Sequence, residues 1–487
     1  MVTKILLIGT AAREHAIAEA LAKSENIQLN AFLEGANPGI IKICKETGGR
    51  YKKGNLIDAK QILEFAREIS PDFAFVGPEE PQFYGVTNAL IDHNIPCVGA
   101  LKEAAMIEMS KAFMRRLMAK YKIPGRLRFK AFKNVEDALA YIKEYAESIA
   151  IKPARQAGGK GVKVIADLQA YLRKEKAEVK EKHAKRIYEQ NLSKDIEDKI
   201  LIEEKVEGVE YTVQCFTDGK HILAFKPVQD HPHAYDDDLG PETGGMGSIY
   251  SSDILPFLTK REYEESVKII EKTIKCIRKE TGVEYKGAIS GQFMLTDKWG
   301  PTILEFYSRF GDPEVVNVFP ILQNDVIDIC YRIIEGGLNR IRLEVENCDT
   351  VVKCIAPKGY PEHKEIAKGH VVEVDEKKIN ELGAKVYYAS VDERQGKLYT
   401  LGSRVIEIFA KAESIEEAAE IAEKATRYVR SDWKLYHRKD IGTKELLIKR
   451  TEQAQFIREI FEYRKRRGLV GKVIDWLPGK GRIEIEY

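Results

Sequence analysis

The sequence predicts a multidomain protein of mixed α/β and α+β class, and three observations support this prediction. The chain has 487 residues, which is enough for about three domains. Over the first hundred residues, apolar strand-like segments alternate with helical ones, as in a parallel sheet covered by helices. From about residue 199, strand-like segments follow one another across turn residues, which indicates antiparallel hairpins.

The first hundred residues are expected to form the parallel α/β unit. Residues 4–9 (KILLIG) and 73–76 (FAFV) are apolar runs bounded by glycine or proline, which favours buried strands. Residues 13–24 (REHAIAEALAKS) have the composition of a helix. Ligands of such sheets bind at the carboxyl ends of the strands, so we expect the first-domain site near Gly9 and Gly77–Glu79.

The central region is predicted to combine helices with antiparallel strands. Residues 110–123 (SKAFMRRLMAKYKI) form a helix that ends before a proline, and residues 148–154 (SIAIKPA) form a strand. Residues 199–228 contain successive strands with a turn at Asp218-Gly219. Residues 287–307 have the pattern of a hairpin.

Four units follow from these patterns. They are an N-terminal domain (1–105), a central domain with two subdomains (106–335), a C-terminal domain of mixed strands and helices (336–445) and an additional tail (446–487). Apolar residues in 456–468 (FIREIFEYRKRRG) recur at helical spacing. Packing on the protein is therefore the expected role of the tail, with oligomer contacts as the alternative.

Composition argues against several classes of function. The 78 basic and 76 acidic residues leave a net charge of +2, which gives no basic surplus for binding nucleic acid. No apolar run reaches membrane-spanning length, and the N-terminus has no signal-peptide pattern. Seven scattered cysteines without a C-x-x-C pair argue against a zinc ribbon or a disulfide framework. We expect a cytoplasmic protein that acts on small molecules.

Three lysines and a glycine-rich segment form a candidate phosphate site. Three glycines surround Lys160 in residues 155–163 (RQAGGKGVK), and such a loop can place backbone N–H groups around phosphates. The Walker A pattern is absent. Lys152 lies in an apolar strand, where its charge needs an anionic partner or access to water, and Lys111 begins a helix. An ordinary glycine turn and a surface edge lysine are the alternatives.

Carboxylates within strands are the second candidate. Glu305 lies in the apolar run ILEFY, and Arg309, Asp312 and Glu314 follow it within a few residues. A strand carboxylate near lysines and a phosphate loop is a suitable magnesium ligand. We expect Asp312 and Glu314 to fix the turn that positions Arg309, with a surface ion-pair cluster as the alternative.

A second glycine-rich loop (241–248, PETGGMGS) follows two histidines. His231 and His233 are spaced like metal ligands, but no third ligand is evident, so roles without metal are favoured. Upstream, residues 201–211 (LIEEKVEGVEY) place glutamates in and after an apolar strand.

In their order and spacing, these stretches resemble the phosphoribosylamine–glycine ligase family, also called glycinamide ribonucleotide synthetases, of the ATP-grasp superfamily. The resemblance spans about residues 4–443. The stretches that carry it are REHA, VGPEEP, SKAFM, GGKGV, EE-x-x-EG-x-E, QDH, GPETGGMG, LEF-x-x-RFGDPE, KGYP and RKDIG.

The resemblance implies a fold, a reaction and its cofactors. The fold would be an N-terminal Rossmann-like parallel α/β (pre-ATP-grasp) domain, a central ATP-grasp domain and a C-terminal mixed β/α domain. The reaction would join glycine to 5-phosphoribosylamine through a glycyl phosphate and give glycinamide ribonucleotide, ADP and phosphate in purine biosynthesis. ATP and Mg²⁺, with Mn²⁺ as the alternative metal, would be the cofactors. The protein would be a monomer or a homodimer.

The resemblance also implies roles for individual residues. The groups that would bind the ATP phosphates are Lys111, Lys152, Gly158, Gly159, Lys160 and Gly161. Backbone groups of Glu203, Glu204 and Val206 would edge the adenine, Glu210 would meet the ribose, and Glu305 would bind the metal. The glycine site would contain Asp230, Thr243, Gly244, Gly245, Met246 and Arg309, of which Asp230 and Arg309 would act in catalysis together with Lys160. The amine substrate would contact Arg13, Glu14, Gly39 and Glu79.

Some positions depart from the family pattern. Tyr307 stands where the family usually has an asparagine as a second metal ligand, and Gln292 on the neighbouring strand is a candidate replacement oxygen. The first loop reads GTAAREH, and Glu242 replaces an asparagine. Two alternatives therefore stay open, a related ligase with a different amine or carboxylate and a non-catalytic nucleotide-binding relative. A dehydrogenase is disfavoured because the first loop lacks the dinucleotide-binding glycines.

Overall fold

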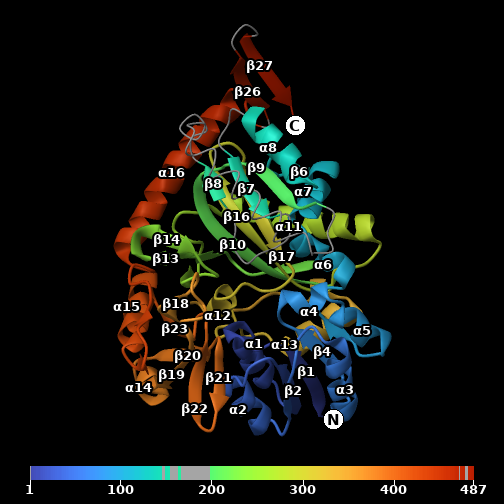
Figure 1. Cartoon of the computed structure of the whole chain (residues 1–487), viewed down its shortest axis with the longest axis vertical. Helices are drawn as coiled ribbons and strands as arrows, with labels where there is room; N and C mark the ends of the chain where they lie inside the picture. The colour runs from blue at the N-terminus through green and yellow to red at the C-terminus, as the bar shows by residue number, and fades with distance from the viewer. Residues whose placement is uncertain are drawn as a thin grey trace.

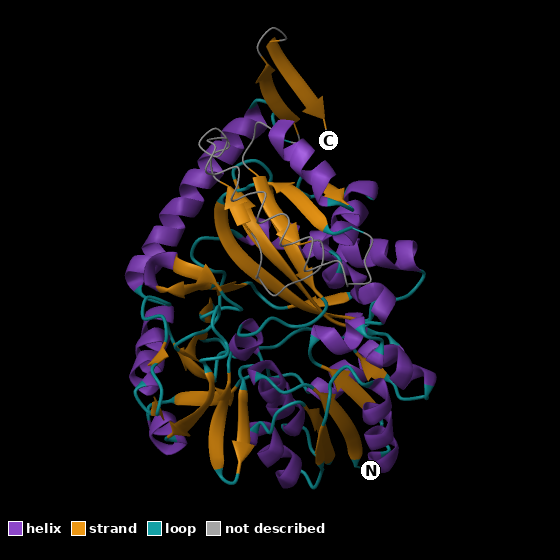
Figure 2. Cartoon of the chain, viewed as in Figure 1, coloured by secondary structure: helices purple, strands orange, loops and turns teal. Residues whose placement is uncertain are grey.

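A computed structural model describes residues 2–144, 149–153, 163–165, 198–470, 472–477 and 481–486. Figure 1 shows the N-terminal and C-terminal domains side by side at one end of the molecule, with the central domain above both. Helices flank the strands throughout (Figure 2). The predicted mixed α/β and α+β fold is confirmed.

The N-terminal domain contains a parallel sheet, as predicted. Its strand order is β3-β2-β1-β4-β5, and all four neighbouring pairs are parallel. The strands are β1 (Thr3–Ile8), β2 (Ile27–Leu33), β3 (Tyr51–Lys53), β4 (Phe73–Val76) and β5 (Cys97–Val98). The helices are α1 (Ala12–Ala22), α2 (Pro38–Glu46), α3 (Ala59–Ile69), α4 (Glu79–Phe83) and α5 (Val86–Asp92).

Alternate residues of β1 supply two separate cores. Ile5 and Leu7 pack with α1 and α2, whereas Leu6 and Ile8 face Ile62 of α3. Helices α12 (Glu314–Val318) and α13 (Val326–Glu335) join the first of these cores. The chain therefore returns to the N-terminal domain immediately after the Arg309 loop.

The central sheet has ten strands and continues into the C-terminal domain. Its main path is β17-β16-β10-β12-β15-β18-β23-β20, with antiparallel pairing throughout. The central strands are β10 (Gly208–Thr217), β11 (Ile222–Ala224), β12 (Val228–Asp230), β15 (Gly247–Tyr250), β16 (Gly287–Thr296) and β17 (Gly300–Tyr307). The C-terminal strands are β18 (Asp349–Pro357), β20 (Ala384–Tyr388), β23 (Ile406–Ala412) and β25 (Leu435–Tyr436).

Helix α11 (Lys260–Thr281) covers one face of this sheet. A Thr259–Glu262 capping box begins the helix, and Gly282 ends it with a φ of 78°. Its buried residues Ile270 and Ile274 share a core with apolar side chains of β10, β16 and β17. The opposite face of these strands is polar and forms the candidate site.

A four-stranded antiparallel sheet lies beside the central one, in the order β6-β9-β7-β8. Its strands are β6 (Phe129–Phe132), β7 (Ile149–Pro153), β8 (Lys163–Ile165) and β9 (Ile200–Glu204). The adjoining helices are α6 (Lys102–Met109), α7 (Lys111–Lys120) and α8 (Val135–Glu144).

The remaining elements belong mainly to the C-terminal domain. A second four-stranded sheet contains β19 (Lys368–Val374), β21 (Val391–Arg394), β22 (Lys397–Leu401) and β24 (Val429–Ser431). Helices α14 (Glu376–Glu381) and α15 (Ile415–Thr426) pack on the C-terminal strands of the ten-stranded sheet. A short hairpin pairs β13 (His233–Tyr235) with β14 (Leu239–Glu242).

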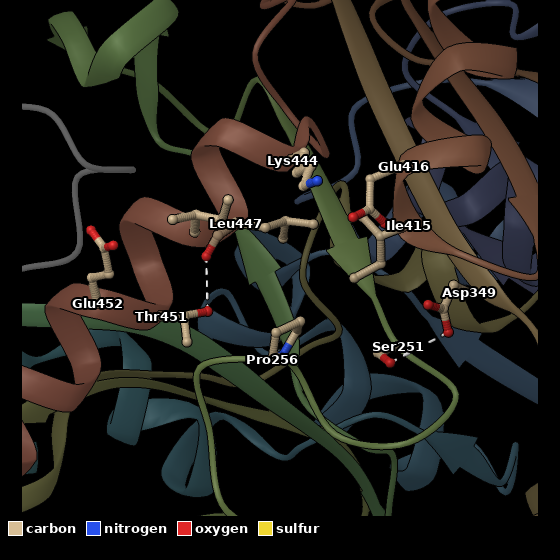
Figure 3. A pocket seen from close by; sticks show the side chains of 10 residues that line it. Ser251, Pro256, Asp349, Ile415, Glu416, Lys444, Leu447, Thr451 and Glu452 are labelled. Carbon is tan, nitrogen blue, oxygen red and sulfur yellow. Dashed lines mark hydrogen bonds between the residues drawn. The ribbon is translucent and has the colours of Figure 1, made fainter.

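The tail forms helix α16 (Lys444–Arg466), followed by the hairpin β26 (Lys472–Leu477) and β27 (Gly481–Glu486). Helix α16 runs from the C-terminal domain along the central domain (Figure 1). It buries Ala454 and Ile457, and Arg458 donates to Glu262 Oε1 at 2.8 Å. A pocket of about 360 Å³ lies between α16, α15 and residues 251–256, and Figure 3 shows the side chains that line it. Packing, the expected role of this segment, is thus observed for α16.

None of the helices in the described ranges combines the length and the apolarity that crossing a membrane requires.

Candidate active site

Polar side chains line the sheet face opposite α11 in two rows. The strand register places Thr212, Gln292 and Glu305 side by side on β10, β16 and β17. The next row along the same strands contains Gln214, Ser290 and Tyr307. Residues two apart on a strand face the same side, so both rows form the floor of one site.

The second row fixes the loop that carries Arg309. Ser290 Oγ donates to the Arg309 carbonyl oxygen at 2.8 Å, and the Gly311 N–H donates to Gln214 Oε1 at 2.8 Å. The Tyr307 ring lies 4.3 Å from the Arg309 guanidinium carbon, within cation–π range. Sheet side chains thus hold both the backbone and the charged group of this residue.

Arg309 lies between two carboxylates from different parts of the chain. Its Nε is 3.3 Å from Glu79 Oε2 and 3.6 Å from Glu108 Oε1. Burial would lower the pKa of Arg309, but Glu108 and Glu79 outweigh it and raise the pKa above its usual value. Burial raises the pKa of Glu108 to about 7, with Arg309 acting in the opposite direction. Ser308 donates to Glu108 through its N–H at 2.6 Å.

Glu305 forms an ion pair with Lys111 at the start of α7. The Glu305 side chain is 16% exposed, so its carboxylate is accessible from the site. Arg115, one turn along α7, donates to the carbonyl oxygens of Ile303 at 2.9 Å and Leu304 at 2.8 Å. Helix α7 therefore fixes the end of β17 that presents Glu305.

A third group of carboxylates lies beside the first row. Gln292 Nε2 donates at 3.1 Å to both Glu210 Oε2 and Asp230 Oδ1. Thr212 Oγ1 donates to Gln292 Oε1 at 2.5 Å and also lies 3.2 Å from Glu314 Oε1. The Gln292 oxygen thus accepts from Thr212, and its amide nitrogen joins the two carboxylates.

The carboxylates of this group are buried and close together, which raises the pKa values of two of them. Burial and the neighbouring Glu210 raise the pKa of Asp230 to about 6. Burial and Asp230 raise the pKa of Glu314 to about 7. Only neutral donors hydrogen-bond these two side chains among the described contacts, so a bound cation would be favoured here.

Loop 243–246 lies against the turn that follows Arg309. Thr243 Oγ1 donates to the Pro232 carbonyl at 2.7 Å, and the Gly245 N–H donates to Thr243 Oγ1 at 3.0 Å. Gly245 has a φ of 106°, and a Cβ there would lie 2.8 Å from Pro313. The side chain of Met246 is fully buried in the core, so only the backbone of this residue is available to a ligand. The structure brings this predicted loop next to Arg309.

The predicted residues of the first domain divide into two kinds. Arg13 Nη1 donates to the Phe310 carbonyl at 3.3 Å and lies 4.0 Å from Glu79, so both residues reach the Arg309 loop. Glu14 is 1% exposed and accepts from Ala11 N–H at 2.8 Å and from Arg13 Nε. These contacts fix Glu14 within the first loop.

At Gly39, the space for a side chain is filled by a histidine. A Cβ on Gly39 would lie 2.0 Å from the His15 ring. Glycine is therefore needed here for close packing between α1 and α2.

The structure describes some of the residues that were predicted to bind the nucleotide. Glu203 pairs with Arg115, and Glu204 Oε1 accepts from the Arg128 N–H at 3.0 Å. Their carboxylates therefore support the structure, and Val206 follows the end of β9. Lys152 lies in β7, but its side chain is outside the described residues, as are Gly158, Gly159, Lys160 and Gly161.

The two histidines of the QDH-x-H segment lie beside backbone carbonyl groups. His231 Nδ1 is 3.3 Å from the Gly247 carbonyl, and His233 Nδ1 is 3.2 Å from the Gly240 carbonyl. In the described part of the chain, no three His, Cys, Asp or Glu side chains are arranged to hold a metal ion.

Comparison with known families and proteins now places the chain. Its sequence matches models described as the phosphoribosylglycinamide synthetase N domain over residues 3–108, ATP-grasp (A) domain over 109–315 and C domain over 350–444. The chain belongs to the phosphoribosylglycinamide synthetase family.

Individual relatives agree with this family over almost their whole length. The chain is 43% identical to a phosphoribosylamine–glycine ligase of Methanopyrus kandleri over 93% of this chain and 99% of the relative. It is 44% identical to that of Methanocaldococcus jannaschii over 93% of this chain and 100% of the relative. The family models end at residue 444, so almost all of α16 and the final hairpin lie beyond them.

Solved structures support the fold. The crystal structure of a phosphoribosylamine–glycine ligase from Thermotoga maritima is similar with a TM-score of 0.72 and 26% identity, covering 90% of this chain and 100% of that one. A biotin carboxylase domain from Hydrogenobacter thermophilus, solved with MgADP, has a TM-score of 0.68 and 16% identity, covering 95% of this chain and 99% of that one. The second likeness concerns the fold alone.

Several residues around the site were not singled out from the sequence. Glu108 stands between the apolar residues Ile107 and Met109, the same signal that drew attention to Glu305 in its strand. Arg115 and Arg404 had no such signal, because each is one arginine among many until the fold places it. Tyr360 belongs to the KGYP stretch, which carried the family resemblance without a role.

Proposed function

We propose that this protein is an ATP-dependent ligase that joins glycine to 5-phosphoribosylamine and forms glycinamide ribonucleotide, ADP and phosphate in purine biosynthesis. The observation that carries the proposal is that Glu305, its ion-pair partner Lys111 and the Arg309 loop meet at one polar sheet face in a chain of this family. The first-domain residues Arg13 and Glu79 open onto the same site.

The chemistry explains why these residue types meet. A carboxylate is a poor electrophile, so one oxygen of glycine first takes the γ-phosphoryl group of ATP, and ADP leaves. The nitrogen of phosphoribosylamine then attacks the carbonyl carbon, phosphate leaves with the C–O bond electrons, and the nitrogen loses a proton. Such a route needs positioning and charge neutralisation more than a protein nucleophile.

Arg309 is proposed to bind the glycine carboxylate and its acyl phosphate. A guanidinium can donate two parallel hydrogen bonds to such a group, and Tyr307 and Ser290 already fix its position. The neighbouring Asp230 and Glu314 would receive the glycine ammonium group, whose positive charge offsets their mutual repulsion. Loop 243–246 would close the glycine site beside them.

Some of the residues at the nucleotide side are suited to bind ATP and Mg²⁺. Glu305 offers an accessible carboxylate, and Lys111 beside it suits a phosphate. Tyr307 is a weak second ligand, because burial and the nearby Glu305 raise the pKa of its phenol well above the usual value and keep it neutral. When bound, Mg²⁺ would neutralise charge on the phosphates. The nucleotide bound in the biotin carboxylase neighbour supports this proposal.

A coupled ADP-release assay tests the function. The wild type is assayed with ATP, Mg²⁺, glycine and phosphoribosylamine formed in place from ribose 5-phosphate and ammonia, and each component is omitted in turn. We expect turnover only with the complete mixture. Glu305→Ala should lower turnover at least about 100-fold. The exposed strand glutamate Glu373 gives the matched control, Glu373→Ala, which should keep wild-type turnover.

Two outcomes would contradict the proposal. ADP release that needs neither glycine nor the amine would make the protein an ATPase of another kind. Binding of ATP without any turnover would lead to a panel of other amines and carboxylates, which tests the related ligase suggested by the altered first loop.

A further inference from the structure

Arg404 of the C-terminal domain binds two segments of the site at once. Its Nη1 donates to the carbonyl oxygens of Gly244 at 3.0 Å, Gly245 at 2.9 Å and Asp312 at 2.9 Å. Its Nη2 donates to Asp312 Oδ1 at 3.0 Å. The side chain is only 11% exposed, so these are contacts of a nearly buried guanidinium. One residue thus joins loop 243–246 to the turn 310–313.

Tyr360, from the same domain, binds the N–H group of Gly244, the residue whose carbonyl group binds Arg404. Its hydroxyl oxygen accepts from the Gly244 N–H at 2.9 Å. The Tyr360 backbone is held in turn, because Tyr436 Oη donates to its carbonyl at 2.9 Å. Both polar backbone groups of Gly244 therefore hydrogen-bond to side chains of the C-terminal domain.

Glu407 lies beneath this arginine with no hydrogen bond in the described structure. It is 0% exposed, and neither carboxylate oxygen has a donor among the described residues. The distance from Arg404 Nη1 to Glu407 Oε1 is 3.8 Å, and Asp312 is close by. Burial and Asp312 raise the pKa of Glu407 well above its usual range, and Arg404 offsets only part of this. Burial and the neighbouring Asp312 therefore favour the protonated form of the Glu407 carboxyl group.

A protonated Glu407 has a clear partner. Its O–H can donate to the Asp312 carboxylate, whose other contact is Arg404. A carboxylate that accepts from both sides is fixed in one orientation. The chain Glu407–Asp312–Arg404 would then end on the carbonyl groups of Gly244 and Gly245.

We propose that Arg404 is a positioning residue of the ligase reaction, which fixes loop 243–246 against the Arg309 turn, and that Glu407 supports it as a neutral hydrogen-bond donor to Asp312. This inference rests on the proposed function, because that function assigns loop 243–246 to the glycine site. Arg404 donates four hydrogen bonds to the loop and the turn, so it acts through the loop. Misplacing a substrate-binding loop by about 1 Å costs about 10- to 100-fold in rate.

The test uses the full chain and compares Arg404→Met and Arg404→Lys with Arg430→Met, an exposed arginine of the same domain. Steady-state kinetics give kcat and the KM for glycine, displacement of a fluorescent ATP analogue gives nucleotide affinity, and thermal melting reports folding. We expect Arg404→Met to lower kcat/KM for glycine about 10- to 100-fold, with ATP affinity within about twofold of wild type. Arg404→Lys should lose less, and Arg430→Met nothing.

If Arg404→Met fails to fold, the variant Tyr360→Phe tests the proposal in its place. It removes the hydroxyl that accepts from the Gly244 N–H of the loop. The kcat/KM for glycine should therefore fall again, while ATP affinity stays unchanged. Loss of glycine and ATP affinity together in every folded variant, or wild-type kcat/KM in Arg404→Met, would overturn the proposal. Absence of turnover in the wild type would instead contradict the proposed function, so the two failures are distinguishable.

Glu407 is tested by a conservative pair. The amide of Glu407→Gln also donates to Asp312, so kcat/KM for glycine should stay within about threefold of wild type, whereas Glu407→Ala should approach Arg404→Met. A loss in Glu407→Gln equal to that in Glu407→Ala would show that an ionised carboxylate is required, which would overturn the neutral-donor role.

Discussion

Two arginines flank the same turn, and their surroundings differ. Arg404 makes four hydrogen bonds to groups of loop 243–246 and the turn. Arg309 makes one, to the Phe310 carbonyl at 3.1 Å, and its Nε makes none within the described structure. Glu79, Glu108 and the Tyr307 ring balance its charge without using up its donors.

The difference separates a binding group from a framework group. A guanidinium has five N–H donors, and a nearly buried one with unused donors is suited to an anionic ligand. A guanidinium whose donors are occupied by the protein fixes the groups around it instead. Charge alone does not distinguish these roles, because neighbouring carboxylates raise the pKa of both residues.

The largest effect is expected at Arg309. Arg309→Lys keeps a positive charge between Glu79 and Glu108 but cannot form the two parallel hydrogen bonds. We expect kcat/KM for glycine to fall at least about 100-fold while the protein still melts cooperatively. Steady-state kinetics and thermal melting of the same sample check this. Activity within threefold of wild type would remove the distinction between the two arginines.

Tyr307 tests whether the aromatic ring holds Arg309. Tyr307→Phe keeps the ring over the guanidinium, so the KM for glycine should stay within about threefold of wild type. Tyr307→Leu removes the cation–π contact and should raise that KM about tenfold. Equal values for the two variants would mean that the ring does not position Arg309, and a loss in Tyr307→Phe alone would point to the hydroxyl.

Glu108 gives a pH-dependent test of the same cluster. Its folded-state pKa of about 7 lies above its ordinary value, so the native state binds this proton more tightly than the unfolded state. Its contribution to stability is therefore greatest at low pH and is lost as the pH rises toward and through 7. The melting temperature of Glu108→Gln should rise relative to wild type between pH 5 and pH 8. A difference that stays constant over this range would contradict the buried titration.

The smallest effect on activity is expected from the tail, which is remote from both arginines. Deleting residues 446–487 removes α16 and its buried Ala454 and Ile457, so the melting temperature should fall by at least about 5 °C. The control deletion of residues 471–487 removes only the final hairpin and should lower it less. In both proteins kcat/KM for glycine should stay within about twofold of wild type. An unchanged melting temperature in the longer deletion would mean that α16 adds no stability.

Local patterns in the sequence determined much of the fold. The apolar run of β1 and the hairpin of β16 and β17 were predictable, because strand periodicity and turn residues depend on neighbours in the chain. The face of Glu305 followed from the same alternation, and the ordered motifs identified the family. These features need no knowledge of distant contacts.

The tertiary structure alone decided how distant segments meet. Pairing of β15 with β18 carries one sheet across the predicted boundary between central and C-terminal domains, and α12 and α13 pack on the N-terminal sheet. The roles of Arg404 and Glu108 arise from these contacts, between residues far apart in sequence. Local propensity and spacing fix which strand or helix forms, but burial of apolar faces against one another fixes which polar groups are left facing the same site.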